Sequence, residues 1–179
     1  MFCSVIISKM KNEISIRISK KSDIKSIAIV SSGCFPQDYI VGENKINDLA
    51  IAEKWFAKRL SLKPFSWLFV AVNKNKKVVG FAYFMMIGGL SGIVQLEIMG
   101  VDEKYRRQGI ASKLISQGEK IITKDFAKQF KKPIVKFILT TSMENQNSHY
   151  VYQKQGFIKT ASLGELYFGA EEVLYTKNI

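Results

Sequence analysis

Cationic side chains stand directly before two small residues in the segment Arg106-Arg107-Gln108-Gly109-Ile110-Ala111-Ser112. A strand pattern precedes this segment and a long helical pattern follows it, and a helix start exposes unpaired backbone N–H groups and the positive end of the helix dipole. Gly109 and Ala111 allow an anion to approach the backbone, and Arg106 and Arg107 add charge and forked donors. The segment predicts a phosphate or pyrophosphate site. The alternative is an ordinary basic helix start with solvated arginines.

A second group of polar residues shares one face of a predicted helix. Asn145, Ser148, His149 and Tyr152 are offset by three, four and seven residues, so they fall in one row. Because the row follows a predicted buried strand, it indicates a surface that faces a ligand. The alternative is a solvated helix face on which Asn145 is the N-cap and Tyr152 is a packed aromatic.

The elements that must position these residues follow from the periodicity of apolar residues. Strands are predicted at 14–18, 67–72, 78–87, 93–101, 134–140, 157–163 and 172–177, with a turn at 73–77. Helices are predicted at 22–28, 46–60, 109–130 and 145–155. The order β-α-α-β-β-β-α-β-α-β-β predicts an α/β fold with a mixed sheet, in one domain over 1–179 with its core at about 14–177. The crossover helix at 109–130 should make the two strands that flank it parallel neighbours.

The pattern also predicts which side chains face inward. Ser22 and Asp23 are expected to cap the first helix. In the second helix, the residues expected to face inward are Leu49, Ala50, Trp55, Phe56 and Leu60. In the long helix, they are Ala111, Leu114, Ile115, Gly118, Ile121, Ile122 and Phe126. On the strand at 93–101, strict alternation puts Gln95, Glu97 and Met99 on one face and Leu96 and Ile98 on the other.

Composition restricts the function classes. The chain has 179 residues, 47% of them hydrophobic, and a formal net charge of +12. No apolar run could span a bilayer and the first residues do not resemble a signal peptide, so we expect a cytoplasmic protein without membrane contact. Cys3 and Cys34 form no metal spacing, and no metal is expected. The lysines are scattered and no nucleic-acid-binding motif is present, so the charge favours nucleic acid only weakly.

The two motifs together resemble those of the GNAT superfamily of N-acetyltransferases. Arg106 to Ala111 is similar to the acyl-CoA pyrophosphate loop of that family, written Gln/Arg-x-x-Gly-x-Gly/Ala. Asn145 to Phe157 is similar to its segment Asn-x-x-Ala-x-x-x-Tyr-x-x-x-Gly-Phe, although Ser148 replaces the alanine, and Glu103 stands where the family often has proline. The resemblance extends over Ile14 to Lys177. It implies the GNAT acyl-CoA N-acyltransferase fold and acetyl-CoA as cosubstrate, with dimers common in the family.

The resemblance also implies roles for single residues. The strand residues Met99, Gly100 and Val101 would pair with the pantetheine arm of acetyl-CoA, and Asn145 would contact it. The backbone from Arg106 through Arg107, Gln108, Gly109, Ile110 and Ala111 to Ser112 would hold the pyrophosphate. Tyr152 would lie beside the thioester sulfur and protonate the leaving thiolate.

The proton acceptor and the amine substrate stay open. Glu97 is the candidate base, because family members place an acid at its position or at that of Gln95. The alternative is a carboxylate that lies at the surface or pairs with a charge on the substrate. His149 is a rival base, with a polar helix-face residue as its alternative. The amine acceptor, a small molecule or peptide, would contact the loop at 33–42 and the last strand pair. The candidate contact residues are Asp38 and Tyr39 in the loop and Glu165 and Tyr167 in the strand pair. A CoA-binding module without catalysis is a second hypothesis for the whole chain, and a basic nucleic-acid-binding protein is a third.

Overall fold

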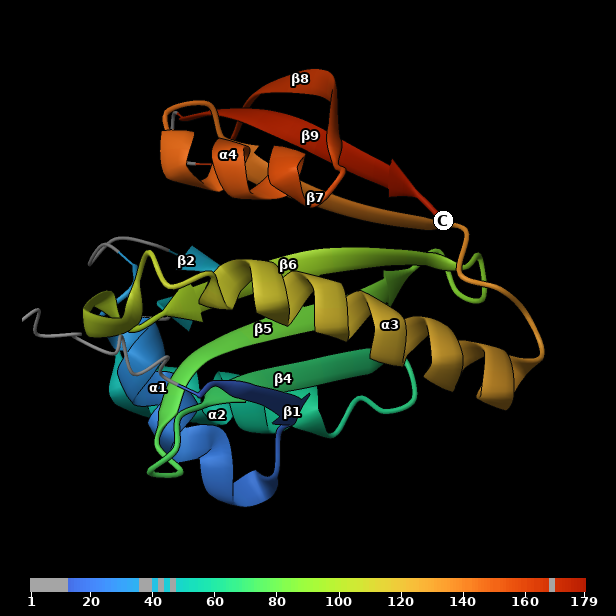
Figure 1. Ribbon diagram of the computed structural model, residues 1–179. Helices are drawn as coiled ribbons and strands as arrows, with labels where there is room; N and C mark the ends of the chain where they lie inside the picture. The colour runs from blue at the N-terminus through green and yellow to red at the C-terminus, as the bar shows by residue number, and fades with distance from the viewer. Residues whose placement is uncertain (1–12, 36–39, 42–43, 46–47, 168–169) are drawn as a thin grey trace, which may run out of the picture.

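The computed structural model describes residues 13–35, 40–41, 44–45, 48–167 and 170–179. The strands are β1 Ser15–Ile18, β2 Ile40–Val41, β3 Asn44–Lys45, β4 Ser66–Val72, β5 Val78–Ile87, β6 Ile93–Val101, β7 Lys136–Ser142, β8 Ile158–Tyr167 and β9 Ala170–Asn178. The helices are α1 Ile24–Ser32, α2 Leu49–Leu60, α3 Ile110–Phe130 and α4 Gln146–Lys154, with short 3-10 turns η1 Lys21–Asp23 and η2 Glu103–Tyr105. Figure 1 shows their arrangement. None of the described helices is long and apolar enough to span a membrane.

Seven strands form one mixed sheet in the order β1-β4-β5-β6-β7-β9-β8, and β2 and β3 form a separate pair that the sequence did not predict. The mixed α/β architecture is confirmed. β6 and β7, which α3 connects, are parallel as predicted. Their ladder is short, because it joins only Ile93–Gln95 to Lys136–Ile138, and beyond it the two strands diverge toward their C-terminal ends (Figure 1).

Helices cover both faces of the sheet. α1 and α2 pack on one face through buried residues such as Ile27, Trp55 and Phe56. α3 packs on the opposite face through Leu114 and Phe126. The core on that side also contains side chains from α4 and β9. The α3 stripe is confirmed at its central positions, whereas Ala111 is only half-buried.

A β-bulge in the pairing of β5 with β6 breaks the predicted alternation along β6. The register shifts after Tyr83, which pairs with Ile98, whereas the next residue of β5 pairs with Leu96. Leu96 and Met99 both face the α3 side, and Ile98 faces the α1/α2 side. The prediction that Met99 shares the face of Glu97 is therefore wrong, because the extra residue at a bulge reverses the side-chain direction downstream.

Two predictions about helix ends and faces need correction. Asp23 is the N-cap residue of α1 as predicted, but its carboxylate does not cap the helix, since it accepts from the Lys20 backbone and from both terminal nitrogens of Arg17. Leu49 and Ala50 are exposed rather than inward, because the buried stripe of α2 starts one turn after its N-cap, Asp48. The turn at 73–77 is confirmed.

Candidate active site

The start of α3 is open and lacks a side-chain cap. Its N-cap, Gly109, has a left-handed backbone with φ 74°, and no described side chain caps the helix. A Cβ atom added at Gly109 would have no atom within 4 Å, so the space beside this backbone is free. Arg106 and Arg107 are exposed next to it. The first turn therefore presents N–H groups and the positive helix end to open space, and two exposed cations precede it in the chain, which suits a phosphate group.

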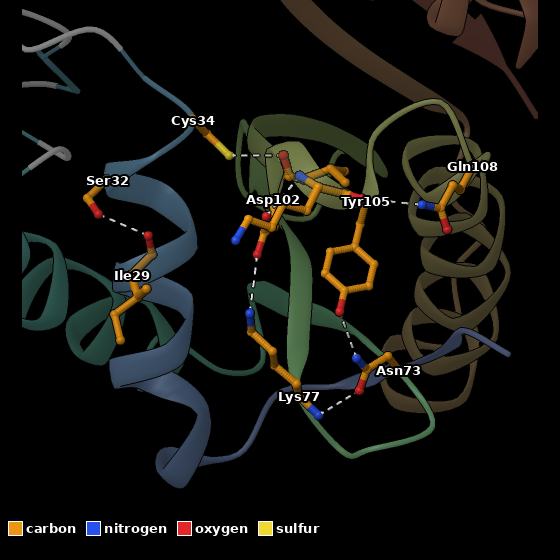
Figure 2. A network of polar contacts seen from close by, with 10 residues as sticks. Ile29, Ser32, Cys34, Asn73, Lys77, Asp102, Tyr105 and Gln108 are labelled. Carbon is orange, nitrogen blue, oxygen red and sulfur yellow. Dashed lines mark hydrogen bonds and ion pairs between the residues drawn. The ribbon is translucent and has the colours of Figure 1, made fainter. Parts of the chain in front are cut away.

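Hydrogen bonds hold the loop that leads into α3 (Figure 2). The Asp102 carboxylate accepts from the backbone N–H of Lys104 at 3.1 Å, and the Gln108 amide donates to the Lys104 carbonyl at 3.4 Å. Asn73, in the turn between β4 and β5, donates to the Tyr105 hydroxyl at 3.1 Å. The loop is thus fixed to itself and to the neighbouring hairpin before any ligand binds.

The carbonyl of Val101, the last residue of β6, is a further anchor. Arg106 Nε donates to it at 3.2 Å and the Cys34 thiol donates at 3.4 Å. Burial raises the pKa of Cys34, and nearby Arg106 opposes this increase. Cys3 lies outside the described residues.

The predicted pantetheine strand segment lies between the end of the parallel ladder and this loop. Met99 packs against the core under α3. Close packing explains why glycine stands at position 100, which the sequence did not reveal. A Cβ atom there would meet the Phe81 ring at 2.7 Å and Cys34 Sγ at 2.9 Å. Beyond Gln95, β6 has no ladder to β7 within these fully described strands, so backbone groups on that edge have no strand partner.

Glu97 lies at the bulge, on the α1/α2 side of the sheet. Its Oε1 is 3.7 Å from Arg59 Nη2, and its side chain is 16% exposed. Its Oε2 is buried and has no hydrogen-bond partner among the described residues. Burial raises the pKa of Glu97, and the nearby Arg59 guanidinium opposes that increase. Arg59 is not among the residues predicted from the sequence, because its approach to β6 depends on how α2 lies across the sheet.

The row of polar residues on α4 does not face solvent as a unit. Asn145 is the N-cap of α4, and its side chain accepts from the Ser148 backbone N–H at 3.3 Å. His149 is buried, with Nδ1 2.9 Å from the Tyr175 hydroxyl and Nε2 3.0 Å from the Met143 carbonyl. Since a carbonyl only accepts, Nε2 donates to it, and in a neutral imidazole Nδ1 then accepts from Tyr175. His149 is therefore neither the predicted polar helix-face residue nor a base with a free nitrogen.

Tyr152 lies one turn further along α4, and its side chain is in the core on the α3 side. It is 8% exposed, and its ring centroid is 6.3 Å from that of Phe157 and 6.0 Å from that of Tyr175. The structure thus puts the two catalytic candidates, Tyr152 and Glu97, on the two opposite faces of the sheet, on either side of the region where β6 and β7 separate. Of the acceptor candidates, Asp38 and Tyr39 lie outside the described residues, and Glu165 is exposed on β8.

Three solved structures share this architecture. The ribosomal-protein-S5-alanine acetyltransferase from Vibrio fischeri has a TM-score of 0.73 and 17% identity, covering 92% of each chain. Mutant forms of the spermidine/spermine N-acetyltransferase SpeG from Vibrio cholerae give 0.70 and 15%, covering 92% of this chain and 93% of theirs. The ribosomal-protein-S18-alanine N-acetyltransferase from Escherichia coli gives 0.69 and 15%, covering 93% and 94%. At these identities the likeness is one of fold.

Sequence comparison is more specific. No curated protein matches the chain. A sequence model of the Acetyltransferase (GNAT) family matches residues 34–157, which is more than half of the chain and includes β6, the loop, α3 and α4. The chain therefore belongs to the GNAT family of acetyltransferases and is a GNAT-type N-acetyltransferase.

Proposed function

We propose that this chain moves an acetyl group from acetyl-CoA to a primary amine of a small molecule or peptide, by direct attack in a ternary complex. One observation carries the proposal: the uncapped, open start of α3 lies directly after β6, whose ladder to β7 has already ended. The N–H groups of Ile110 to Ser112, with Arg106 and Arg107, would hold the pyrophosphate. The free edge of β6 at Met99 to Val101 would pair with the pantetheine amides, beside Asn145.

The chemistry requires one proton acceptor and one donor. A primary amine has a pKa of about 10, so it must lose a proton to attack. Glu97 would accept that proton, directly or through water, and its raised pKa suits it to this role. A carbon–nitrogen bond then forms, the nitrogen releases its second proton to solvent, and the carbon–sulfur bond breaks. The Tyr152 hydroxyl would give its proton to the leaving thiolate, and a backbone N–H near Met99 would polarise the acetyl carbonyl.

The names of the structural neighbours suggest acceptors to try. One of them acts on spermidine and spermine and two act on alanine of a ribosomal protein. We therefore propose two acceptor probes, spermidine and a short peptide with an N-terminal alanine. Release of free thiol in the presence of either probe would distinguish an enzyme from a module that binds CoA without catalysis.

The binding test compares acetyl-CoA, free CoA and ATP by titration calorimetry. We expect both CoA forms to bind with an affinity on the order of micromolar and ATP not to bind. Gly109→Val should weaken acetyl-CoA binding by more than about tenfold, because the added side chain would occupy the space of the pyrophosphate.

Gly89→Val is the matched control for this variant. Gly89 also has a positive φ, of 64°, and also has no atom within 4 Å of an added Cβ. It lies in the turn between β5 and β6, at the opposite end of β6 from the loop. Both variants should lose similar stability from backbone strain, and only Gly109→Val should lose affinity. Equal affinity in the two variants would refute the assignment of the loop.

A further inference from the structure

Four buried polar atoms without a hydrogen-bond partner among the described residues gather around the bulge of β6. They are Trp55 Nε1, Arg59 Nε, Tyr83 Oη and Glu97 Oε2. The Arg59 guanidinium stacks on the Trp55 ring, 3.9 Å from its centroid, and the Trp55 and Tyr83 rings meet edge to face at 5.5 Å. Because buried polar groups in folded proteins nearly always find partners, such a concentration needs a functional explanation.

The position of the Arg59 guanidinium is fixed from two sides. Trp55, one turn earlier on α2, is 3% exposed and holds the flat face of the guanidinium. The Ser66 hydroxyl donates to the Arg59 backbone carbonyl at 3.0 Å, which ties the end of α2 to the start of β4. The Arg59 side chain is 21% exposed, so its charge acts on Glu97 through a partly desolvated environment.

The pair of Arg59 and Glu97 is close enough for charge attraction and too long for a hydrogen bond. Their nearest atoms are 3.7 Å apart, and no described donor reaches Glu97 Oε2. A forked pair at 2.7 to 2.9 Å, like that of Arg17 with Asp23, would strongly favour the ionised carboxylate and make it a poor base. Glu97 is instead compensated in charge while its lone pairs stay available.

The other titratable group that faces Glu97 is Tyr83 from β5. Burial raises the pKa of Tyr83, and nearby Ser66 and Arg59 oppose that increase. Tyr83 therefore stays protonated where Glu97 ionises and adds no charge to it. Among the described residues, Arg59 is the one cation that acts on this carboxyl.

We infer that Arg59 is a positioning residue that sets the protonation state of Glu97, and through it the lower pH limit of amine acetylation. The inference rests on the proposed function, in which Glu97 takes the proton that the ammonium group loses before its nitrogen attacks the acetyl carbon. Trp55 acts one step further away, since it holds the guanidinium.

The test replaces Arg59 and follows Glu97 directly. The Glu97 carboxyl is titrated by carbon-13 NMR in the intact protein, with its signal assigned from Glu97→Gln. Arg59→Met should move the titration midpoint upward by about one pH unit, because an opposite charge at this distance has been removed. The acid limb of kcat/KM, measured with acetyl-CoA and the better of the two acceptor probes, should move upward by the same amount. Lys58→Met, which removes an exposed charge from the same turn, should move neither.

Two additional variants keep the test decisive. If Arg59→Met unfolds, Arg59→Gln removes the charge while keeping a polar side chain, and the same upward shift is expected. Arg59→Lys, which keeps the charge, should return the midpoint toward its wild-type value. An unchanged midpoint in a folded variant without the Arg59 charge overturns the inference. Wild-type turnover in Glu97→Gln would instead refute the base role of Glu97, so the two failures are distinguishable.

Discussion

Two buried tyrosines lie side by side near the C-terminal half of the sheet and differ in what their hydroxyls do. Tyr175 on β9 donates to His149 Nδ1 at 2.9 Å, which fixes the imidazole. Tyr152 on α4 is the candidate acid, and its ring packs between those of Phe157 and Tyr175. A matched pair of substitutions can therefore separate the proposed acid role of Tyr152 from the structural role of Tyr175.

Tyr152→Phe should lower turnover by about 100-fold, because general acid catalysis typically contributes this much or more. Acetyl-CoA affinity and thermal stability should change little, since the ring and its packing remain. The control, Tyr175→Phe, should cost about 1 kcal/mol of stability through the lost hydrogen bond and leave turnover nearly unchanged. Steady-state kinetics and calorimetry on both variants check this, and unchanged turnover in Tyr152→Phe would refute its acid role.

Among the secondary-structure elements, the start of α1 is tied to β1 by one carboxylate. Asp23 accepts from Arg17 Nη1 at 2.7 Å and Nη2 at 2.9 Å, and from the Lys20 backbone N–H at 2.7 Å. The hydrogen bonds from Arg17 lower the pKa of Asp23, and the Lys20 backbone N–H contributes to this decrease. A depressed carboxyl pKa stabilises the folded state above the pKa of the unfolded chain, and the contribution is lost as the pH falls through the folded value.

Asp23→Asn should therefore lower the free energy of unfolding by about 1 to 2 kcal/mol at neutral pH, because Arg17 is partly exposed. The difference from wild type should shrink as the pH falls from about 7 to about 2, because wild-type Asp23 becomes protonated. Urea unfolding across this range measures it. Asp48→Asn is the matched control, because it makes the same substitution at the N-cap of α2, where asparagine can also cap the helix. A deficit that stays constant with pH would contradict this account.

At the scale of the whole molecule, the sheet divides where β6 and β7 separate. β7, β8, β9 and α4 are joined to the other strands by a short parallel ladder and by α3, which crosses between them (Figure 1). A partly buried ion pair adds a third connection, with Lys177 Nζ of β9 2.6 Å from Glu119 Oε2 of α3. The division leaves the edge of β6 beyond Gln95 without a partner in β7, while the pair keeps the two parts together.

Lys177→Met should lower the free energy of unfolding by about 2 to 3 kcal/mol at neutral pH, because it leaves the Glu119 carboxylate buried without its cation. Burial already raises the pKa of Glu119 and Lys177 opposes this increase, so the variant should raise that pKa further. The loss should then be largest at neutral and alkaline pH and smaller as the pH falls and Glu119 takes up a proton. The double variant with Glu119→Gln should recover much of the stability, and a double variant no better than the single one would contradict the pairing.

Much of this protein could be predicted from local sequence patterns. The bounds of β5 and β6, the turn at 73–77 and the buried stripe of α3 were predicted because periodicity and turn chemistry are properties of neighbouring residues. The two motifs predicted the GNAT family, which the family match confirms. The assignments of single residues to acetyl-CoA remain predictions.

Contacts between distant segments were decided by the tertiary structure. The bulge puts Glu97 and Met99 on opposite faces of the sheet. It depends on the pairing of β6 with β5, which alternation within one strand does not encode. Arg59 reaches Glu97 only because α2 crosses that face of the sheet, and His149 meets Tyr175 only because α4 packs on β9. The sequence alone determined most of the elements and the position of the loop at 106–112, whose signals are local. The surroundings of Glu97 and the contacts of His149 depend on long-range packing, so they required the assembled sheet.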